Sequence, residues 1–67
     1  MGVQAMNITA LTLQIRGDAE HSKGHTKEAC RLYADAALVL RKLGNKDAAR
    51  CLDERIDELK KEAANRE

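Results

Sequence analysis

Residues 24–36 read GHTKEACRLYADA, and this stretch decides the fold because it encodes a chain reversal followed by the start of a helix. Gly24 can adopt the left-handed backbone conformation that ends a helix. Thr26 can then cap the next helix, while Glu28 meets the positive end of that helix's dipole. The reversal is therefore encoded locally, without help from distant parts of the chain.

The same stretch also predicts how its helix packs. Ala29, Tyr33 and Ala36 stand at positions i, i+4 and i+7, so they share one helical face. The two alanines allow a neighbouring backbone to come close on either side of the tyrosine ring. We expect this face to pack against another helix.

Similar signals on both sides of this stretch predict three helices, over residues 4–23, 27–43 and 46–64 of a single domain spanning residues 1–67. Gly44 and Asn45 repeat the reversal, with a glycine that ends the second helix and an asparagine that caps the third. The chain has no Phe, Trp or Pro and a single Tyr. Its core must therefore be built from aliphatic residues that suit helix packing, and we predict an all-α, antiparallel three-helix bundle.

Apolar residues at helical spacing give each helix an expected core face. These residues are Ile8, Leu11, Ile15 and Ala19 in the first helix; Ala29, Leu32, Tyr33, Ala36, Val39, Leu40 and Leu43 in the second; and Ala48, Ala49, Leu52, Ile56, Leu59 and Ala63 in the third.

Further apolar residues fall outside these core faces. Met6, Ala10 and Leu13 form a second stripe on the first helix, on the side away from Ile8 and Ile15, and Leu38 stands on the outward side of the second helix. Two interpretations stay open. These side chains are ordinary exposed apolar residues, or they form a docking surface for a partner helix or for a second copy of the chain.

Composition excludes several classes of function. Twelve Lys and Arg against eleven Asp and Glu give a net charge of +1, dispersed along the chain, and a nucleic-acid binder needs a concentrated basic face. No apolar run approaches the ~20 residues of a membrane span, and no signal peptide can be drawn. We expect a soluble, cytoplasmic protein that binds no nucleic acid and does not insert into membranes.

The two cysteines are predicted to be free thiols. Antiparallel helices joined near Gly44 would leave Cys30 and Cys51 offset by about 10 Å along the helix axis, which is too far for a disulfide. Free thiols fit a reducing compartment.

Candidate catalytic and metal-binding residues do not form a convincing site. His21 and His25 are separated by Gly24, which interrupts the helix, so they do not share the face of a helical zinc pair. The acids of residues 53–58 alternate with Arg and Lys, as on a solvated helix face. Cys30 has no base predicted beside it. We expect no enzyme activity, no metal and no cofactor.

The spacing of these residues resembles two known helical families. Gly17 and Ala19 fall where the tetratricopeptide (TPR) repeat carries small residues in its first helix, and residues 24–36 continue that pattern. With its third helix, the chain resembles the MIT (microtubule-interacting and trafficking) domain. The residues that carry this resemblance are Gly24, Glu28, Ala29, Leu32, Tyr33 and Ala36, with Arg55, Glu58, Leu59 and Lys60 in the third helix.

The resemblance implies an adaptor that takes a short amphipathic helical peptide into a groove between its helices. The typical ligand is the tail of an ESCRT-type membrane-remodelling protein, which implies a place at the periphery of endosomal membranes. The alternative is a helical unit for homo-oligomerisation or scaffolding, with the chain as a homodimer. The residues predicted to contact a partner are Met6, Leu13, Leu38, Val39 and Arg55.

Overall fold

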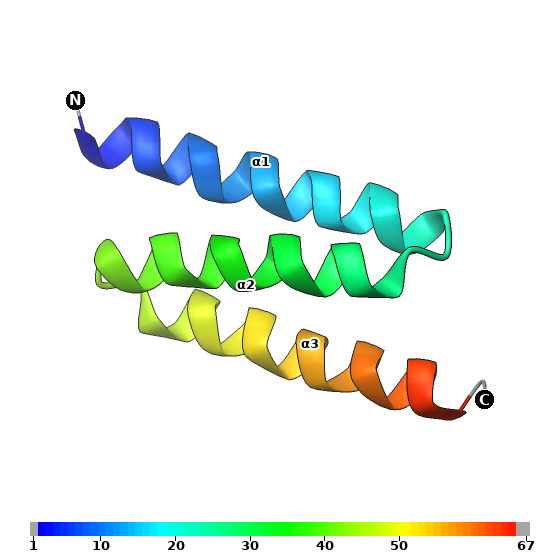
Figure 1. The fold of residues 1–67 in the computed structure, drawn as a ribbon. Helices are drawn as coiled ribbons and strands as arrows, with labels where there is room; N and C mark the ends of the chain where they lie inside the picture. The colour runs from blue at the N-terminus through cyan, green and yellow to red at the C-terminus, as the bar shows by residue number, and fades with distance from the viewer. Residues whose placement is uncertain (1, 66–67) are drawn as a thin grey trace.

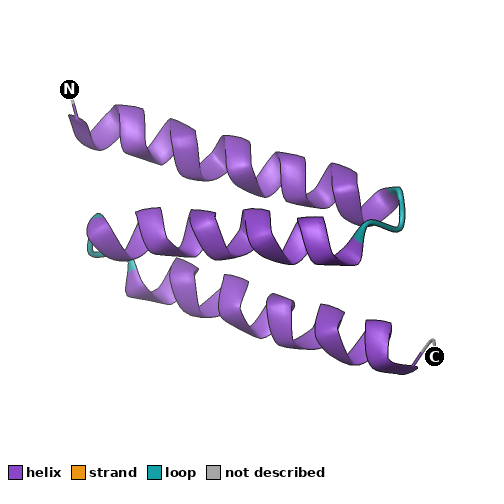
Figure 2. Ribbon diagram, viewed as in Figure 1, coloured by secondary structure: helices purple, strands orange, loops and turns teal. Residues whose placement is uncertain are grey.

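A computed structural model describes residues 2–65, with side chains from residue 5. Three antiparallel α-helices follow one another as α1 (Gly2–Ser22), α2 (Thr26–Lys42) and α3 (Lys46–Asn65), with α2 in the middle (Figure 1). Within residues 2–65 there is no strand (Figure 2). The all-α three-helix prediction is confirmed, and each predicted helix end lies within two residues of the observed end. The predicted domain also includes residues 1, 66 and 67, which lie outside the described residues.

The two turns use the same backbone device. Gly24 and Gly44 have φ values of 85° and 82°, in the left-handed region that glycine adopts without a Cβ clash. The amide of His25 donates a hydrogen bond to the carbonyl of Glu20 at 2.9 Å. In the second turn, the amide of Asn45 donates to the carbonyl of Leu40 at 2.9 Å. This is the Schellman motif, which satisfies helix carbonyls that otherwise lack partners.

The turns differ in how the following helix is capped. The side chain of Asn45 accepts a hydrogen bond from the amide of Ala48 at 3.3 Å, which confirms the predicted cap of α3. The predicted cap by Thr26 is wrong. The carbonyl of His25 already accepts the first helical bond of α2, from Ala29 at 3.0 Å, so Thr26 lies inside the helix and no side chain caps it.

The bundle is open on one side. Both α1 and α3 pack against α2, whereas α1 and α3 contact each other within the described residues only through side chains at their edges, such as Asp18 with Arg55. The Cα atoms span 44 × 20 × 11 Å, so the helices lie side by side with little depth (Figure 1). Each outer helix therefore keeps one face directed away from the rest of the domain.

The core between the helices is small and rich in alanine. Five of its nine buried apolar residues are alanines. The nine are Ala10, Ala29, Tyr33, Ala36, Ala37, Leu40, Ala49, Leu52 and Leu59. The predicted faces of α2 and α3 are largely confirmed, with Val39, Ala48 and Ile56 partly buried against this cluster. Ala63 is exposed, so its assignment to the core is wrong.

The predicted orientation of α1 is wrong. Ala10 is buried and Leu13 packs against the core, whereas Ile8 and Ile15 are 65% and 58% exposed. The physical reason is the ring of Tyr33, which lies so close to α1 that a Cβ on Gly17 would come within 2.7 Å of it. The ring packs against the face that carries this glycine, which turns the opposite face outward.

Candidate functional site

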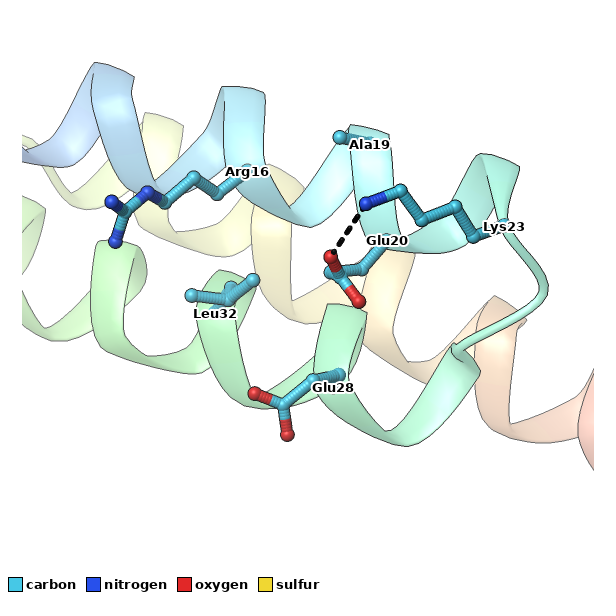
Figure 3. A pocket seen from close by; sticks show the side chains of 6 residues that line it. All are labelled: Arg16, Ala19, Glu20, Lys23, Glu28 and Leu32. Atoms are coloured by element: carbon cyan, nitrogen blue, oxygen red, sulfur yellow. Dashed lines mark ion pairs between the residues drawn. The ribbon is translucent and has the colours of Figure 1, made fainter.

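The outward side of α1 carries a continuous apolar stripe. We call it the outer α1 face and define it by Ala5, Ile8, Leu11, Thr12, Ile15 and Ala19, all of which are exposed. Figure 3 shows Ala19 on the side of α1 directed away from α2. The stripe exists because α1 has apolar residues on two faces, and packing on α2 covers only one of them.

No charged residue interrupts the outer α1 face. The first charged side chain in the sequence is Arg16, so the first four turns of α1 are uncharged in a chain that is 34% charged. The hydroxyl of Thr12 donates to the carbonyl of Ile8 at 2.8 Å, inside the helix. Because this bond satisfies the hydroxyl locally, the threonine adds little polarity to the stripe.

The extent of this surface is large relative to the core. Ile8, Leu11 and Ile15 are 65%, 56% and 58% exposed, and the core buries only three leucines. A surface that exposes as many large aliphatic side chains as the core encloses is unusual for a free-standing domain. Exposed apolar surfaces of this kind mark sites of protein association.

A contact among the three helices holds α1 in this orientation. The Tyr33 hydroxyl of α2 donates to the Asp18 carboxylate of α1, and the Arg55 guanidinium of α3 lies 5.5 Å from the centre of the tyrosine ring. Arg55 also lies 3.8 Å from Asp18. Burial raises the pKa of Tyr33, and the bond to Asp18 raises it further. Each helix contributes one residue, so this cluster fixes the rotation of α1 about its axis.

The two histidines make contacts at the turn end of the bundle. His25 donates to Glu20 at 2.7 Å, and this bond lowers the pKa of Glu20. His21 lies 3.6 Å from Glu62 of α3. Across the described part of the chain, no three His, Cys, Asp or Glu side chains are grouped as metal ligands. Each contact joins groups of which at least one is exposed to solvent, so each contributes little to stability.

Two hollows that border α1 have mostly polar or charged walls. The one drawn in Figure 3 lies between α1 and α2 and is lined by Arg16, Ala19, Glu20, Lys23, Glu28 and Leu32. Lys23 and Glu20 form an ion pair across its edge at 3.5 Å. A second hollow, between α1 and α3, is lined by Gln14, Cys51, Leu52, Glu54, Arg55 and Glu58. Neither offers an apolar floor comparable with the outer α1 face.

The five residues predicted to contact a partner do not form one surface. Leu13 and Val39 are partly buried and pack against the core. For Leu13, this corrects its predicted place on a stripe away from the core. Met6 is half-buried, and Leu38 is 53% exposed on α2. Arg55 contacts Tyr33 and Asp18 within the chain.

The sequence prediction missed Ile8, Leu11 and Ile15 as surface residues because it assigned them to the core. Gly17 was the available signal. A glycine inside a helix lowers helix stability by ~1 kcal/mol relative to alanine, so it indicates a close contact on its own face. That face also carries Ala10 and Leu13, the two residues that the structure turns inward.

Two further properties of the described residues concern membrane spans and the cysteines. None of the described helices is long and apolar enough to cross a membrane. Cys30 is half-buried and Cys51 is exposed, and both are free thiols as predicted.

Comparison with known protein families, with individual characterised proteins and with solved structures finds no match to this chain.

Proposed function

We propose that this chain is a non-catalytic protein–protein interaction module that binds an amphipathic helix of a partner protein along the outer α1 face. The observation that carries the proposal is the uncharged stripe of Ile8, Leu11 and Ile15, exposed on a helix whose other face is already packed. Burying such side chains is the main favourable contribution to protein association.

The shape of the stripe favours a helical ligand. Its large residues stand at i, i+3 and i+7, the spacing of the ridges that helices use to pack against one another. From Ala5 to Ala19 it extends about 21 Å, at ~1.5 Å per residue, which matches four turns of a ligand helix. A single helix laid along α1 would therefore cover it.

The likeness of residues 24–36 to the MIT domain extends the proposal to a role. In this extended proposal, the chain is a cytoplasmic adaptor in membrane trafficking, and its ligand is the helical tail of a membrane-remodelling protein. The contact surface differs from the groove between helices that the resemblance implies, because the two hollows that border α1 have mostly polar or charged walls.

Selection from a displayed library of helical peptides tests the proposal. Peptides selected on the wild-type protein are measured against Leu11→Asp and Leu38→Asp, two variants that place a carboxylate at leucines of similar exposure, 56% and 53%. We expect binding to weaken at least about tenfold for Leu11→Asp, because a buried carboxylate without a counter-charge is costly. Binding to Leu38→Asp should be unchanged. Peptides that bind both variants equally well, or a library that yields none, would contradict the proposal.

A further inference from the structure

We infer that the outer α1 face pairs with the same face of a second copy of this chain, in antiparallel orientation, about a two-fold axis that passes near Leu11 and Thr12. This inference rests on the proposed function, because it names a partner for the same surface. It is argued from the charges along α1, the spacing of its apolar residues and the direction of the helix.

The absence of charge on the outer α1 face is matched by the same face of a second copy. A surface that covers the outer α1 face must itself be uncharged over about four turns, since a charge opposite Ile8 or Ile15 would lose its water without gaining a partner. The exposed sides of α2 and α3 carry many Lys, Arg, Asp and Glu residues. The outer α1 face meets the requirement, because residues 1–15 contain no charged side chain.

The spacing of the apolar residues along α1 also suits a second copy. Ile8 and Ile15 lie at equal distances in sequence from the midpoint between Leu11 and Thr12. A two-fold axis through this midpoint sets Ile8 opposite Ile15 of the second copy and brings the two Leu11 side chains together at the centre. A surface that is complementary to itself in this way is what a two-fold symmetric dimer requires.

The charges beside the stripe favour the antiparallel direction. Arg16 and Asp18 flank the C-terminal part of the stripe, and no charged side chain lies along its N-terminal part. A parallel pair would set Arg16 beside Arg16 and Asp18 beside Asp18, and like charges so placed repel. An antiparallel pair places them beside uncharged residues of the other copy.

The same charge pattern disfavours a lipid surface as the occupant. Helices that lie on membranes carry Lys or Arg on their polar side, where they meet anionic head groups. The first four turns of α1 contain neither residue. A protein surface of matching polarity is the better partner.

Sedimentation equilibrium over a range of concentrations tests the pairing. We expect the average mass of the wild-type protein to rise from 7.4 kDa towards twice that value as concentration increases. Leu11→Asp should stay monomeric, and Leu38→Asp should behave as the wild type. Leu11→Ala, which favours helix, serves if Leu11→Asp lowers helicity measured by circular dichroism, and it should weaken the association. A wild-type protein that is monomeric throughout, or association that survives both Leu11 changes, would overturn the inference.

Cysteine cross-linking tests the direction. In a background in which Cys30 and Cys51 are changed to Ser, Leu11→Cys should form a disulfide with itself on mild oxidation, because the two positions meet near the axis. Ile15→Cys should not cross-link with itself, since its counterpart lies about 10 Å away along the helix, but it should cross-link with Ile8→Cys. Equal self-cross-linking at positions 11 and 15 would indicate a parallel pair and contradict the inference.

The failure of this inference differs from the failure of the proposed function. A monomeric wild-type protein whose selected peptides depend on Leu11 would overturn the self-pairing and leave the interaction surface in place. A dimer that Leu38→Asp dissociates, together with peptides that ignore Leu11, would overturn both.

Discussion

The two outer helices pack on the same central helix, yet they present opposite surfaces to solvent. The outward side of α3 is charged, with Arg50, Glu54, Asp57, Glu58 and Lys61 all exposed. The outer α1 face carries no charge and exposes three large aliphatic side chains. Covering a charged face with another protein surface is costly, because the charges would have to leave water. Covering an uncharged apolar face is favourable. This contrast is the reason for placing the proposed interaction surface on α1.

The two helices also attach to α2 by different means. α3 contributes Leu52 and Leu59 to the core, together with Ala49. In α1 the close contact is made by Gly17, against the ring of Tyr33. Ala10 and Leu13 add apolar contacts to this one, but the buried side chains of α1 are smaller than those of α3.

The largest expected effect comes from Tyr33→Ala, which removes the side chain that α1 packs against. Truncating a buried aromatic residue costs about 3–5 kcal/mol. Amide hydrogen exchange should show that α1 loses protection before α3 does, and a thermal melt should show the loss of stability. Tyr33→Phe is the control, since it keeps the ring and removes only the bond to Asp18. Equal loss of protection in α1 and α3 would contradict the difference in attachment.

A smaller effect on stability is expected from Gly17→Ala. Whether this change stabilises or destabilises the protein shows how closely α1 approaches the Tyr33 ring. Alanine in place of glycine within a helix ordinarily stabilises by ~1 kcal/mol. Here the added Cβ would lie 2.7 Å from the Tyr33 ring, which is 1% exposed and has little room to move. We expect a net loss of roughly 1–2 kcal/mol from overpacking, measured by urea denaturation.

The control for Gly17→Ala is the same change combined with Tyr33→Leu. Without the ring there is no clash, so alanine at position 17 should become neutral or stabilising. A stabilised single variant would mean that α1 and α2 are further apart than this contact requires.

The two turns provide a third comparison, with an effect near 1 kcal/mol. Asn45→Ala removes the side-chain cap of α3 and should cost about 0.5–1 kcal/mol, at the lower end of measured caps because the bond is long. His25→Ala removes no cap from α2 and should cost less. Melting temperatures of the two variants provide the measurement. A larger loss of stability for His25→Ala would show that the hydrogen bond between His25 and Glu20 contributes more than the Asn45 cap of α3.

The smallest effect on stability is expected when α1 is given a charged exterior like that of α3. Ile8→Lys combined with Ile15→Glu changes side chains that are exposed in the single chain. At protein concentrations where the chain is monomeric, the free energy of unfolding should therefore shift by no more than about 0.5 kcal/mol per site. Circular dichroism melts measure this shift, and Leu13→Glu is the matched change on the inner face, where unfolding is expected. A large loss of stability in the double variant would show that Ile8 and Ile15 are core residues.

The sequence by itself determined the helices, the turns and the packed faces of α2 and α3. Gly24 and Gly44 end helices through local backbone preferences, and no distant contact is needed for that. In α2 and α3 the charged residues occupy one side, so only the other side can be buried. These features were predictable because each depends on residues close together in the chain.

Only the tertiary structure decided which side of α1 is buried. Both of its faces are apolar at helical spacing, so hydrophobicity alone does not distinguish Ile8 and Ile15 from Ala10 and Leu13. The choice comes from shape, because the Tyr33 ring requires the space that Gly17 leaves open, sixteen residues away in the chain. The role of Arg55 was hidden for the same reason, since its contacts with Tyr33 and Asp18 exist only once all three helices have met.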